Sequence, residues 1–222
     1  MELQERTLEV LKSARYAVSP CDPEKVKEVW FVCHGYGQLA PAFLEDFEPI
    51  FQEDRMIIAP EGLHRFYLKG TGGKVGASWM TKEEREKDIQ DYVRYLDQLY
   101  DHTLHDLIGR EIRIRILGFS QGVATVCRWM AHARSRADEL ILWAGVFPPD
   151  LDLSIDKRVF QRMRIRLLVG DQDEYRSQEK LTEEARKFQE HDIPYEFREF
   201  EGSHRIEELP LKALAEGRLG DP

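Results

Sequence analysis

Residues 112–122 read Ile-Arg-Ile-Arg-Ile-Leu-Gly-Phe-Ser-Gln-Gly, and this stretch decides how the rest of the chain is interpreted. The alternating isoleucines predict a β-strand that ends at Gly118. Apolar residues at helical spacing follow directly, at Val123, Ala124, Val126, Cys127, Met130 and Ala131. Ser120 therefore stands between two glycines on a sharp turn from strand to helix, the G-x-S-x-G pattern of a nucleophile elbow. Side chains at Gly118 or Gly122 would crowd such a turn, so the pattern indicates a serine nucleophile.

Strands and helices are predicted to alternate on both sides of this turn. The expected strands are residues 28–33, 55–59, 112–117, 140–143, 165–169 and 195–200. The expected helices are residues 41–51, 81–102, the segment after Ser120, 178–189 and the segment from His204 onward. Thr81 and Glu84 have the spacing of a capping box, which would start the second of these helices. This alternation predicts a mostly parallel sheet with helices on both faces.

Two regions interrupt the alternation. Residues 61–80 contain a glycine-rich stretch, residues 68–76, which lacks the Ser or Thr of a Walker phosphate loop and does not open directly into a helix. We expect it to form a flexible active-site loop. Residues 145–161 are too few for a large lid, which predicts a rather open site.

The composition excludes several classes of function. The 222 residues are 42% hydrophobic and carry a net charge of −9, with no basic patch for a nucleic acid. No apolar run is long enough for a membrane helix, and the amino-terminal residues lack the apolar segment of a secretory signal. Cys21, Cys33 and Cys127 are too scattered for a metal site or a disulfide framework. We expect a cytoplasmic globular protein without stable membrane insertion and without a metal.

A serine hydroxyl becomes a strong nucleophile only when a base accepts its proton and a third group orients that base. In the α/β-hydrolase order, an acid and a histidine follow later strands. The fifth expected strand is followed by Asp171, Asp173 and Glu174, and the sixth by His204. The acid stays open among the three. Asp173 is favoured because it lies on the loop proper, whereas Asp171 follows the strand so closely that it is expected to hold the turn.

The tetrahedral intermediate of acyl transfer also requires hydrogen-bond donors for its negative oxygen. The backbone N–H of Gln121, the residue after the serine, is one expected donor. The second is expected from the loop after an early strand, where the glycines of His34-Gly35-Tyr36-Gly37 permit close backbone approach and Tyr36 supplies the N–H. We expect His34 to hold that loop by hydrogen bonds, since His204 is already the expected general base.

Six short motifs occur along residues 30–206: His34-Gly35-Tyr36-Gly37, Ala59-Pro60, Ser78-Trp79, Gly118-Phe119-Ser120-Gln121-Gly122, Gly170-Asp171-Gln172-Asp173 and Gly202-Ser203-His204. In this combination they resemble the phospholipase/carboxylesterase family, the acyl-protein thioesterase-like branch of the α/β-hydrolases. The resemblance implies one α/β-hydrolase domain over residues 1–222, without a large lid domain. It implies a catalytic triad of Ser120, Asp173 and His204, with Asp173 selected by the G-x-x-D motif of the family. It also implies Tyr36 and Gln121 as the oxyanion donors.

The chain departs from the family at Gln38, where an acidic residue is usual, and in residues 68–76. Both lie near the expected entry of acyl groups, so the resemblance implies hydrolysis of a small acyl ester or thioester without fixing the substrate. No cofactor is implied. We expect Trp79, Trp143 and Phe147 to wall an apolar acyl pocket, with plain packing in the core as the alternative for each. The oligomeric state stays open, a homodimer included.

Two alternatives to a general carboxylesterase remain. One is a dedicated lysophospholipase or acyl-protein thioesterase, which a comparison of acyl chain lengths, and of oxygen esters with thioesters, would separate. The other is a catalytically silent binding protein with a hydrolase fold. The presence of all three expected triad residues argues against the silent protein, and covalent labelling of Ser120 by a fluorophosphonate would exclude it.

Overall fold

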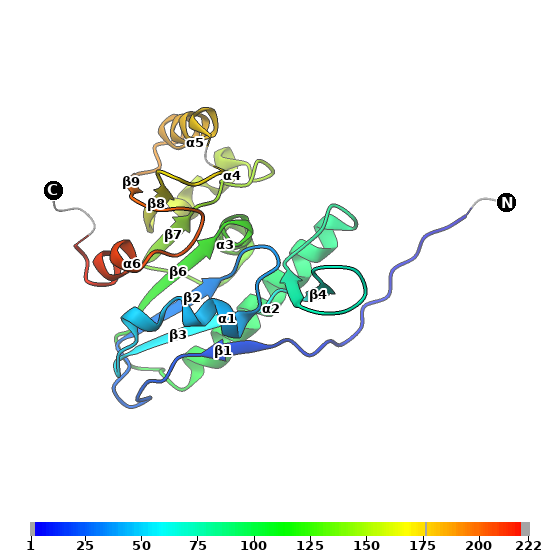
Figure 1. Ribbon diagram of the computed structural model, residues 1–222, viewed down its shortest axis with the longest axis horizontal. Coiled ribbons are helices and arrows are strands. Elements are labelled where there is room, and N and C mark those ends of the chain that lie inside the picture. The colour runs from blue at the N-terminus through cyan, green and yellow to red at the C-terminus, as the bar shows by residue number, and fades with distance from the viewer. Residues whose placement is uncertain (1–2, 176, 219–222) are drawn as a thin grey trace.

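The computed structural model describes residues 3–175 and 177–218 (Figure 1). Within them, a seven-stranded sheet has the spatial order β1-β3-β2-β6-β7-β8-β9. Its strands are β1 (Tyr16–Val18), β2 (Glu28–Cys33), β3 (Arg55–Pro60), β6 (Arg113–Phe119), β7 (Glu139–Trp143), β8 (Arg164–Gly170) and β9 (Tyr195–Phe200). β1 is antiparallel to β3, and the other neighbouring pairs of this sheet are parallel. The predicted mostly parallel sheet is confirmed.

The central strands are buried on both faces, as parallel strands covered by helices must be. Every residue of β7 is buried, and in β6 only the first residue, Arg113, is exposed. Because the chain passes from one parallel strand to the next through a crossover, the carboxyl ends of these strands meet at one edge of the sheet. Ser120, Asp173 and His204 follow β6, β8 and β9, so all three lie in the loops of that edge.

Helices cover both faces of the sheet, as predicted (Figure 1). One apolar core contains side chains of α2 (Arg85–His105), α3 (Gln121–His132), α4 (Leu153–Phe160) and α5 (Gln178–Glu190). The core of the other face contains side chains of α1 (Ala40–Glu45), the short 3₁₀ turn η1 (Glu48–Ile50) and α6 (Glu208–Ala215). None of the helices in the described part of the chain combines the length and the apolar character needed to cross a bilayer.

Three helices differ from their predicted bounds. The helix expected at residues 41–51 is divided into α1 and η1, because Pro49 has no N–H with which to continue a helix. α2 begins at Arg85, and the predicted capping box is wrong: the Thr81 hydroxyl accepts a hydrogen bond from the N–H of Glu83 in a local turn. α6 begins at Glu208 rather than at His204, which lies on the irregular loop before it.

The sequence does not predict β1, α4 or a small hairpin made of β4 (His64–Tyr67) and β5 (Val75–Ser78). The hairpin occupies much of residues 61–80, and its turn carries most of the glycine-rich stretch, residues 68–76, for which we expect a flexible loop. The expectation of a loop is wrong only for Val75 and Gly76, which begin β5. The glycines interrupt the apolar pattern there, so that the short strands on each side do not stand out.

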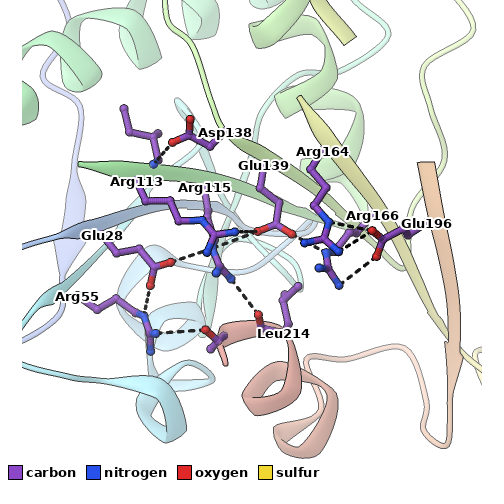
Figure 2. A network of polar contacts seen from close by, with 12 residues as sticks. Glu28, Arg55, Arg113, Arg115, Asp138, Glu139, Arg164, Arg166, Glu196 and Leu214 are labelled. Carbon is purple, nitrogen blue, oxygen red and sulfur yellow. Dashed lines mark hydrogen bonds and ion pairs between the residues drawn. The ribbon is translucent and has the colours of Figure 1, made fainter. Parts of the chain in front are cut away.

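Charged side chains lie near the amino ends of the parallel strands, whereas Ser120 and His204 follow the carboxyl ends. Figure 2 shows these charged side chains and the contacts between them. We refer to them as the charge ladder, because arginines and glutamates alternate from strand to strand as Arg55, Glu28, Arg115, Glu139, Arg166 and Glu196. The Glu139 carboxylate lies 3.1 Å from Arg115 Nε and 2.5 Å from Arg166 Nε, and all three side chains are buried. Arg115 Nη1 also donates to Leu214 O at 2.9 Å. The ladder thus connects neighbouring strands and holds α6 against the sheet.

Candidate active site

Ser120 lies on the sharp turn between β6 and α3, as the sequence predicts. Its φ of 53° and ψ of −114° are strained for a residue with a side chain, as expected of a nucleophile elbow. Close packing requires the glycines on each side. A Cβ on Gly118 would lie 2.3 Å from Gly122 O, and a Cβ on Gly122 would lie 2.1 Å from Cys33 O. The strand, the turn and the helix are therefore locked together around the serine.

The three side chains expected to act together form one hydrogen-bonded chain. His204 Nε2 lies 2.9 Å from Ser120 Oγ, and His204 Nδ1 lies 2.8 Å from Asp173 Oδ2. The Asp173 carboxylate is buried, and its Oδ1 accepts a hydrogen bond of 2.8 Å from the N–H of Tyr175. With that carboxylate ionised, the Nδ1–H group donates a hydrogen bond to Asp173. Nε2 then carries no proton and can accept the proton of the serine hydroxyl.

The structure distinguishes the three acids after β8. Asp171 does not contact His204; its Oδ1 instead accepts a hydrogen bond of 3.0 Å from the N–H of Gly202, on the loop after β9. A Cβ on Gly170 would lie 2.2 Å from Gly202 O, so the two loops pack directly against each other. Glu174 is exposed. Asp173 is the acid beside the histidine, while Asp171 holds the loop that carries His204.

The imidazole of His204 is also held by aromatic rings. The centroid of the Phe119 ring lies 5.0 Å from that of His204, and the Tyr175 ring lies 4.7 Å away in an edge-on arrangement. Rings at these distances limit the rotation of the imidazole about its χ angles. The geometry therefore keeps both ring nitrogens directed at their partners.

His34 holds the His-Gly-Tyr-Gly loop, as the sequence predicts. Its side chain is fully buried, with Nδ1 2.7 Å from Gly35 O and Nε2 2.9 Å from the backbone N of Gly62. Since Gly35 O accepts and the Gly62 N–H donates, the imidazole has one proton, on Nδ1. Burial lowers the pKa of His34, which favours the same neutral form. Gln38 Oε1 accepts a hydrogen bond of 2.8 Å from the N–H of Gly35 and so fixes the loop from its other end.

One expected oxyanion donor, the N–H of Tyr36, lies on the loop after β2, and the other, the N–H of Gln121, lies directly after Ser120. The N–H of Gln121 belongs to the first turn of α3, where helical N–H groups have no partner within the helix. Among the described residues, neither that N–H nor the N–H of Tyr36 donates to an acceptor. The Gln121 side chain fixes the elbow from outside, because its Nε2 donates to Ser78 Oγ at 3.0 Å and its Oε1 accepts the N–H of Trp79 at 3.3 Å.

The β4–β5 hairpin packs against the same loop. The N–H of Gly37 donates to Ala77 O at 2.8 Å, and the N–H of Ala77 donates to Gln38 O at 3.2 Å. The Tyr36 and Phe66 rings lie 5.1 Å apart, which adds a side-chain contact. The hairpin therefore supports the backbone that carries the Tyr36 N–H.

A cavity of about 650 Å³ opens beside Ser120 and His204. Its apolar walls include Phe119, Leu142, Val146, Leu167, Leu181 and Phe197, and its polar lining includes Tyr36, Gln38, Ser177, Lys180 and Glu184. Most of these residues come from the ends of β6 to β9, the segment after β7 and helix α5. The sequence does not identify them, because α5 is polar overall and which of its faces turns inward depends on how the helix docks.

The prediction that Trp79, Trp143 and Phe147 wall this cavity is wrong. All three are buried in the core, and the indole groups are used for hydrogen bonds: Trp79 Nε1 donates to His34 O at 2.9 Å, and Trp143 Nε1 donates to Arg205 O at 3.0 Å. The Phe147 ring packs against aromatic rings of α4 and α5. Large aromatic side chains pack in a core as well as they line a cavity. These three support the loops of the site from the core.

Comparison with known proteins gives matches in sequence and in structure. The profile of the family described as Phospholipase/Carboxylesterase matches residues 15–216, most of the chain. No curated protein matches the chain in sequence. The solved structure of acyl-protein thioesterase 2 from Zea mays is similar with a TM-score of 0.69 and 14% identity, covering 94% of this chain and 100% of that one.

Two bacterial structures are similar to the same extent. The Bacillus cereus carboxylesterase gives a TM-score of 0.67 at 12% identity and covers 92% of this chain and 93% of its own. A phospholipase/carboxylesterase from Dyadobacter fermentans gives a TM-score of 0.66 at 14% identity and covers 95% of this chain and 99% of its own. At these identities the likeness shows the fold alone, and that fold is the α/β-hydrolase fold expected from the sequence.

Proposed function

Because the chain belongs to the phospholipase/carboxylesterase family, we propose that it hydrolyses carboxylic esters or thioesters through an acyl-enzyme intermediate. One observation carries this proposal above the others. The Ser120 hydroxyl, the His204 imidazole and the Asp173 carboxylate are joined by contacts of 2.9 and 2.8 Å at the edge of a cavity wide enough for an acyl group. The arrangement has the parts that acyl transfer to a serine requires.

In the acylation step, Ser120 Oγ attacks the carbonyl carbon while His204 Nε2 accepts the hydroxyl proton. The carbonyl oxygen becomes negative and receives hydrogen bonds from the N–H groups of Tyr36 and Gln121, for which the described part of the chain provides no acceptor. Asp173 stabilises the imidazolium that forms. The bond from carbon to the leaving oxygen or sulfur then breaks, and His204 gives its proton to the departing alkoxide or thiolate.

Deacylation repeats these steps with water as the nucleophile. His204 Nε2 accepts a proton from the water while the hydroxide oxygen forms the new bond to the acyl carbon. The bond from that carbon to Ser120 Oγ breaks, and the serine recovers its proton from the imidazolium. The carboxylic acid leaves, and every proton transfer of both steps has passed through His204.

Hydrolysis of p-nitrophenyl butyrate by the purified protein tests the proposal. We expect turnover by the wild type and a loss of about 10³-fold or more in Ser120→Ala, because removal of a triad member leaves only the binding and oxyanion contributions. Ser154→Ala is the matched control, since Ser154 is exposed on α4 and lies outside the site. Equal turnover by the wild type and Ser120→Ala would contradict the mechanism.

A narrower candidate is an acyl-protein thioesterase or lysophospholipase. One observation favours it: the cavity beside Ser120 has apolar walls of the kind that an acyl chain contacts. Values of kcat/KM for oxygen esters and thioesters of equal acyl length separate this candidate from a general carboxylesterase. A preference for the thioester well beyond its greater chemical reactivity would support the thioesterase.

A further inference from the structure

The cavity contains a buried carboxyl group that the proposed chemistry does not use. Glu184, on α5, lines the cavity, yet only 3% of the residue is exposed to solvent. Apolar side chains such as Val146, Leu167 and Leu181 line the same cavity. Burial of a carboxyl group among apolar side chains costs free energy unless polar partners compensate. The position of Glu184 therefore calls for a partner.

The protein supplies a partner for only one of the two carboxyl oxygens. Oε1 accepts a hydrogen bond of 2.7 Å from the N–H of Phe147. Oε2 forms no hydrogen bond or ion pair with the residues that the structure describes, and it is not among the fully enclosed polar atoms. Since Glu184 lines the cavity, this oxygen is accessible from it. Burial raises the pKa of Glu184 to about 7, so both its ionised and its protonated forms are present near neutral pH.

No cation among the described residues forms an ion pair with this carboxyl group, although the charge of Lys187 opposes part of the effect of burial on its pKa. Lys180, one helical turn earlier, also lines the cavity but forms no ion pair with Glu184 within the described residues. Lys187, on the other side, pairs instead with the exposed Glu183 at 2.9 Å. A side chain needed only to receive the Phe147 N–H would not require a second, unpartnered oxygen facing the substrate cavity. Oε2 therefore has no partner within the described residues, and it faces a cavity in which a ligand group can supply one.

We propose that Glu184 recognises a hydrogen-bond donor on the acyl part of the substrate, so that the preferred substrates are esters or thioesters whose acyl chain carries a hydroxyl or an amino group. This inference rests on the proposed function, because the cavity is assigned to the acyl group by its position beside Ser120. Unsubstituted acyl chains leave Oε2 buried without a partner. Buried polar groups left unpaired by a substrate analogue are a strong source of discrimination.

Pairs of p-nitrophenyl esters with the same leaving group test the proposal. Each donor-bearing ester is compared with its parent: 3-hydroxybutyrate with butyrate, and 6-hydroxyhexanoate and 6-aminohexanoate with hexanoate. The measured quantity is the selectivity ratio, kcat/KM of the donor-bearing ester divided by kcat/KM of its parent. Because His204 and Asp173 act on both esters of a pair, their contribution cancels in this ratio. The hydroxyl and amino arms distinguish the two sources of the donor.

We expect the selectivity ratio of the wild type to exceed 1 for at least one pair and to fall at least about tenfold in Glu184→Gln. In that variant the amide oxygen still accepts the Phe147 N–H, while the NH₂ group replaces the accepting Oε2. Glu184→Leu should lower kcat/KM for the donor-bearing ester and raise it for the parent. Glu183→Gln is the matched control, because Glu183 lies next to Glu184 on α5 but faces solvent; its ratio should equal that of the wild type.

The pH dependence of the ratio gives a second readout that needs no variant. For the amino ester, the ratio in the wild type should rise as pH increases through about 7, because the carboxylate that pairs with the ammonium is forming. Among the described residues, the other titratable groups that line the cavity or act on Glu184 electrostatically are Lys180 and Lys187 of α5, Cys127 of α3, Tyr36, Tyr175, and the Asp173 and His204 pair. In Glu184→Gln this rise should be absent, although these groups remain.

Ratios at or below 1 for every pair in the wild type would overturn the proposal, even if the variants failed to fold. Ratios that are unchanged in both Glu184 variants would overturn it as well. Failure of the proposed function looks different, because the wild type would then hydrolyse neither the parent esters nor the donor-bearing esters. A protein that hydrolyses the parents while ignoring the donors retains the proposed function and refutes only the role of Glu184.

Discussion

Replacing Glu139 by glutamine should destabilise the protein more than any substitution of an exposed ion pair. Glu139 is 1% exposed and stands between the guanidinium groups of Arg115 and Arg166 in the centre of the charge ladder (Figure 2). Burial lowers the pKa of Arg115, and the charges of Glu139 and Glu28 oppose that effect. The variant retains the size of the side chain but removes the negative charge that the two buried arginines share.

The expected loss follows from what remains after the substitution. Removing one partner of a buried ion pair costs about 3–5 kcal/mol, since it leaves a buried charge uncompensated. Arg115 keeps Glu28 at 2.8 Å, and Arg166 keeps Glu196 at 3.3 Å, so we expect a value near the lower end, about 3 kcal/mol. For a chain of this length, that corresponds to a decrease in Tm of roughly 6–12 °C.

Urea unfolding followed by circular dichroism measures this loss at pH 7, provided that the transition is two-state. Glu53→Gln is the control, because Glu53 pairs with Lys25 at 2.7 Å on the exposed surface, where a pair contributes about 1 kcal/mol or less. A loss in Glu139→Gln no larger than that of Glu53→Gln would refute the reasoning. The charge ladder would then contribute to the register of the strands without contributing to stability.

Three further predictions concern the site itself. Asp173→Asn should lower kcat about 10⁴-fold in the p-nitrophenyl butyrate assay, because Asp173 controls the tautomer of the His204 imidazole. Asp171→Asn should lower kcat much less, because its amide oxygen still accepts a hydrogen bond from the Gly202 N–H. Equal losses of kcat in the two variants would contradict the assignment of Asp173 as the acid of the triad. Gly122→Ala should destabilise the fold by at least about 3 kcal/mol, measured by urea unfolding, because its Cβ would lie 2.1 Å from a backbone oxygen. Burial raises the pKa of Glu184 from 4.5 to about 7, so the wild type loses stability as pH rises through that window. The unfolding free energy of Glu184→Gln minus that of the wild type should therefore increase by about 3 kcal/mol between pH 4.5 and 8.5. A difference that stays constant with pH would contradict the burial of this carboxyl group.

Local patterns predict the parts of the site that depend on backbone geometry. The elbow around Ser120 is visible because its close contacts require glycine at two fixed positions, which leaves a trace in the sequence. His204 is visible because the order of the strands requires it after the last one. The role of His34 follows from its place beside the glycines of an early loop, and the structure confirms it.

Features that depend on how elements pack are not predicted by local patterns. Arg115 stands in an alternating strand and resembles a solvent-facing residue, yet it is buried because α6 and the neighbouring carboxylates cover it. Thr81 has the spacing of a capping box, but its hydroxyl is used in a local turn instead. Local patterns also miss Glu184. In the sequence it is typical of a polar helix face, but the way α5 docks places its side chain in the wall of the cavity.

Aromatic residues show the same limit. Trp143 is correctly placed near the site by its position at the end of β7, but the sequence does not reveal whether its ring faces the cavity or the core. In the structure its indole N–H donates to Arg205 O, next to the catalytic candidate His204. The residue supports the histidine loop from the core and leaves the cavity to smaller apolar side chains.

Covalent labelling by a fluorophosphonate probe, located by mass spectrometry of peptides, tests the central claim most directly. The claim is that His204 activates the hydroxyl of Ser120. We predict one adduct, on Ser120, which is absent from the wild type denatured before exposure and is strongly reduced in His204→Ala. No adduct in the native protein, or an adduct on another residue that persists in Ser120→Ala, would contradict the account.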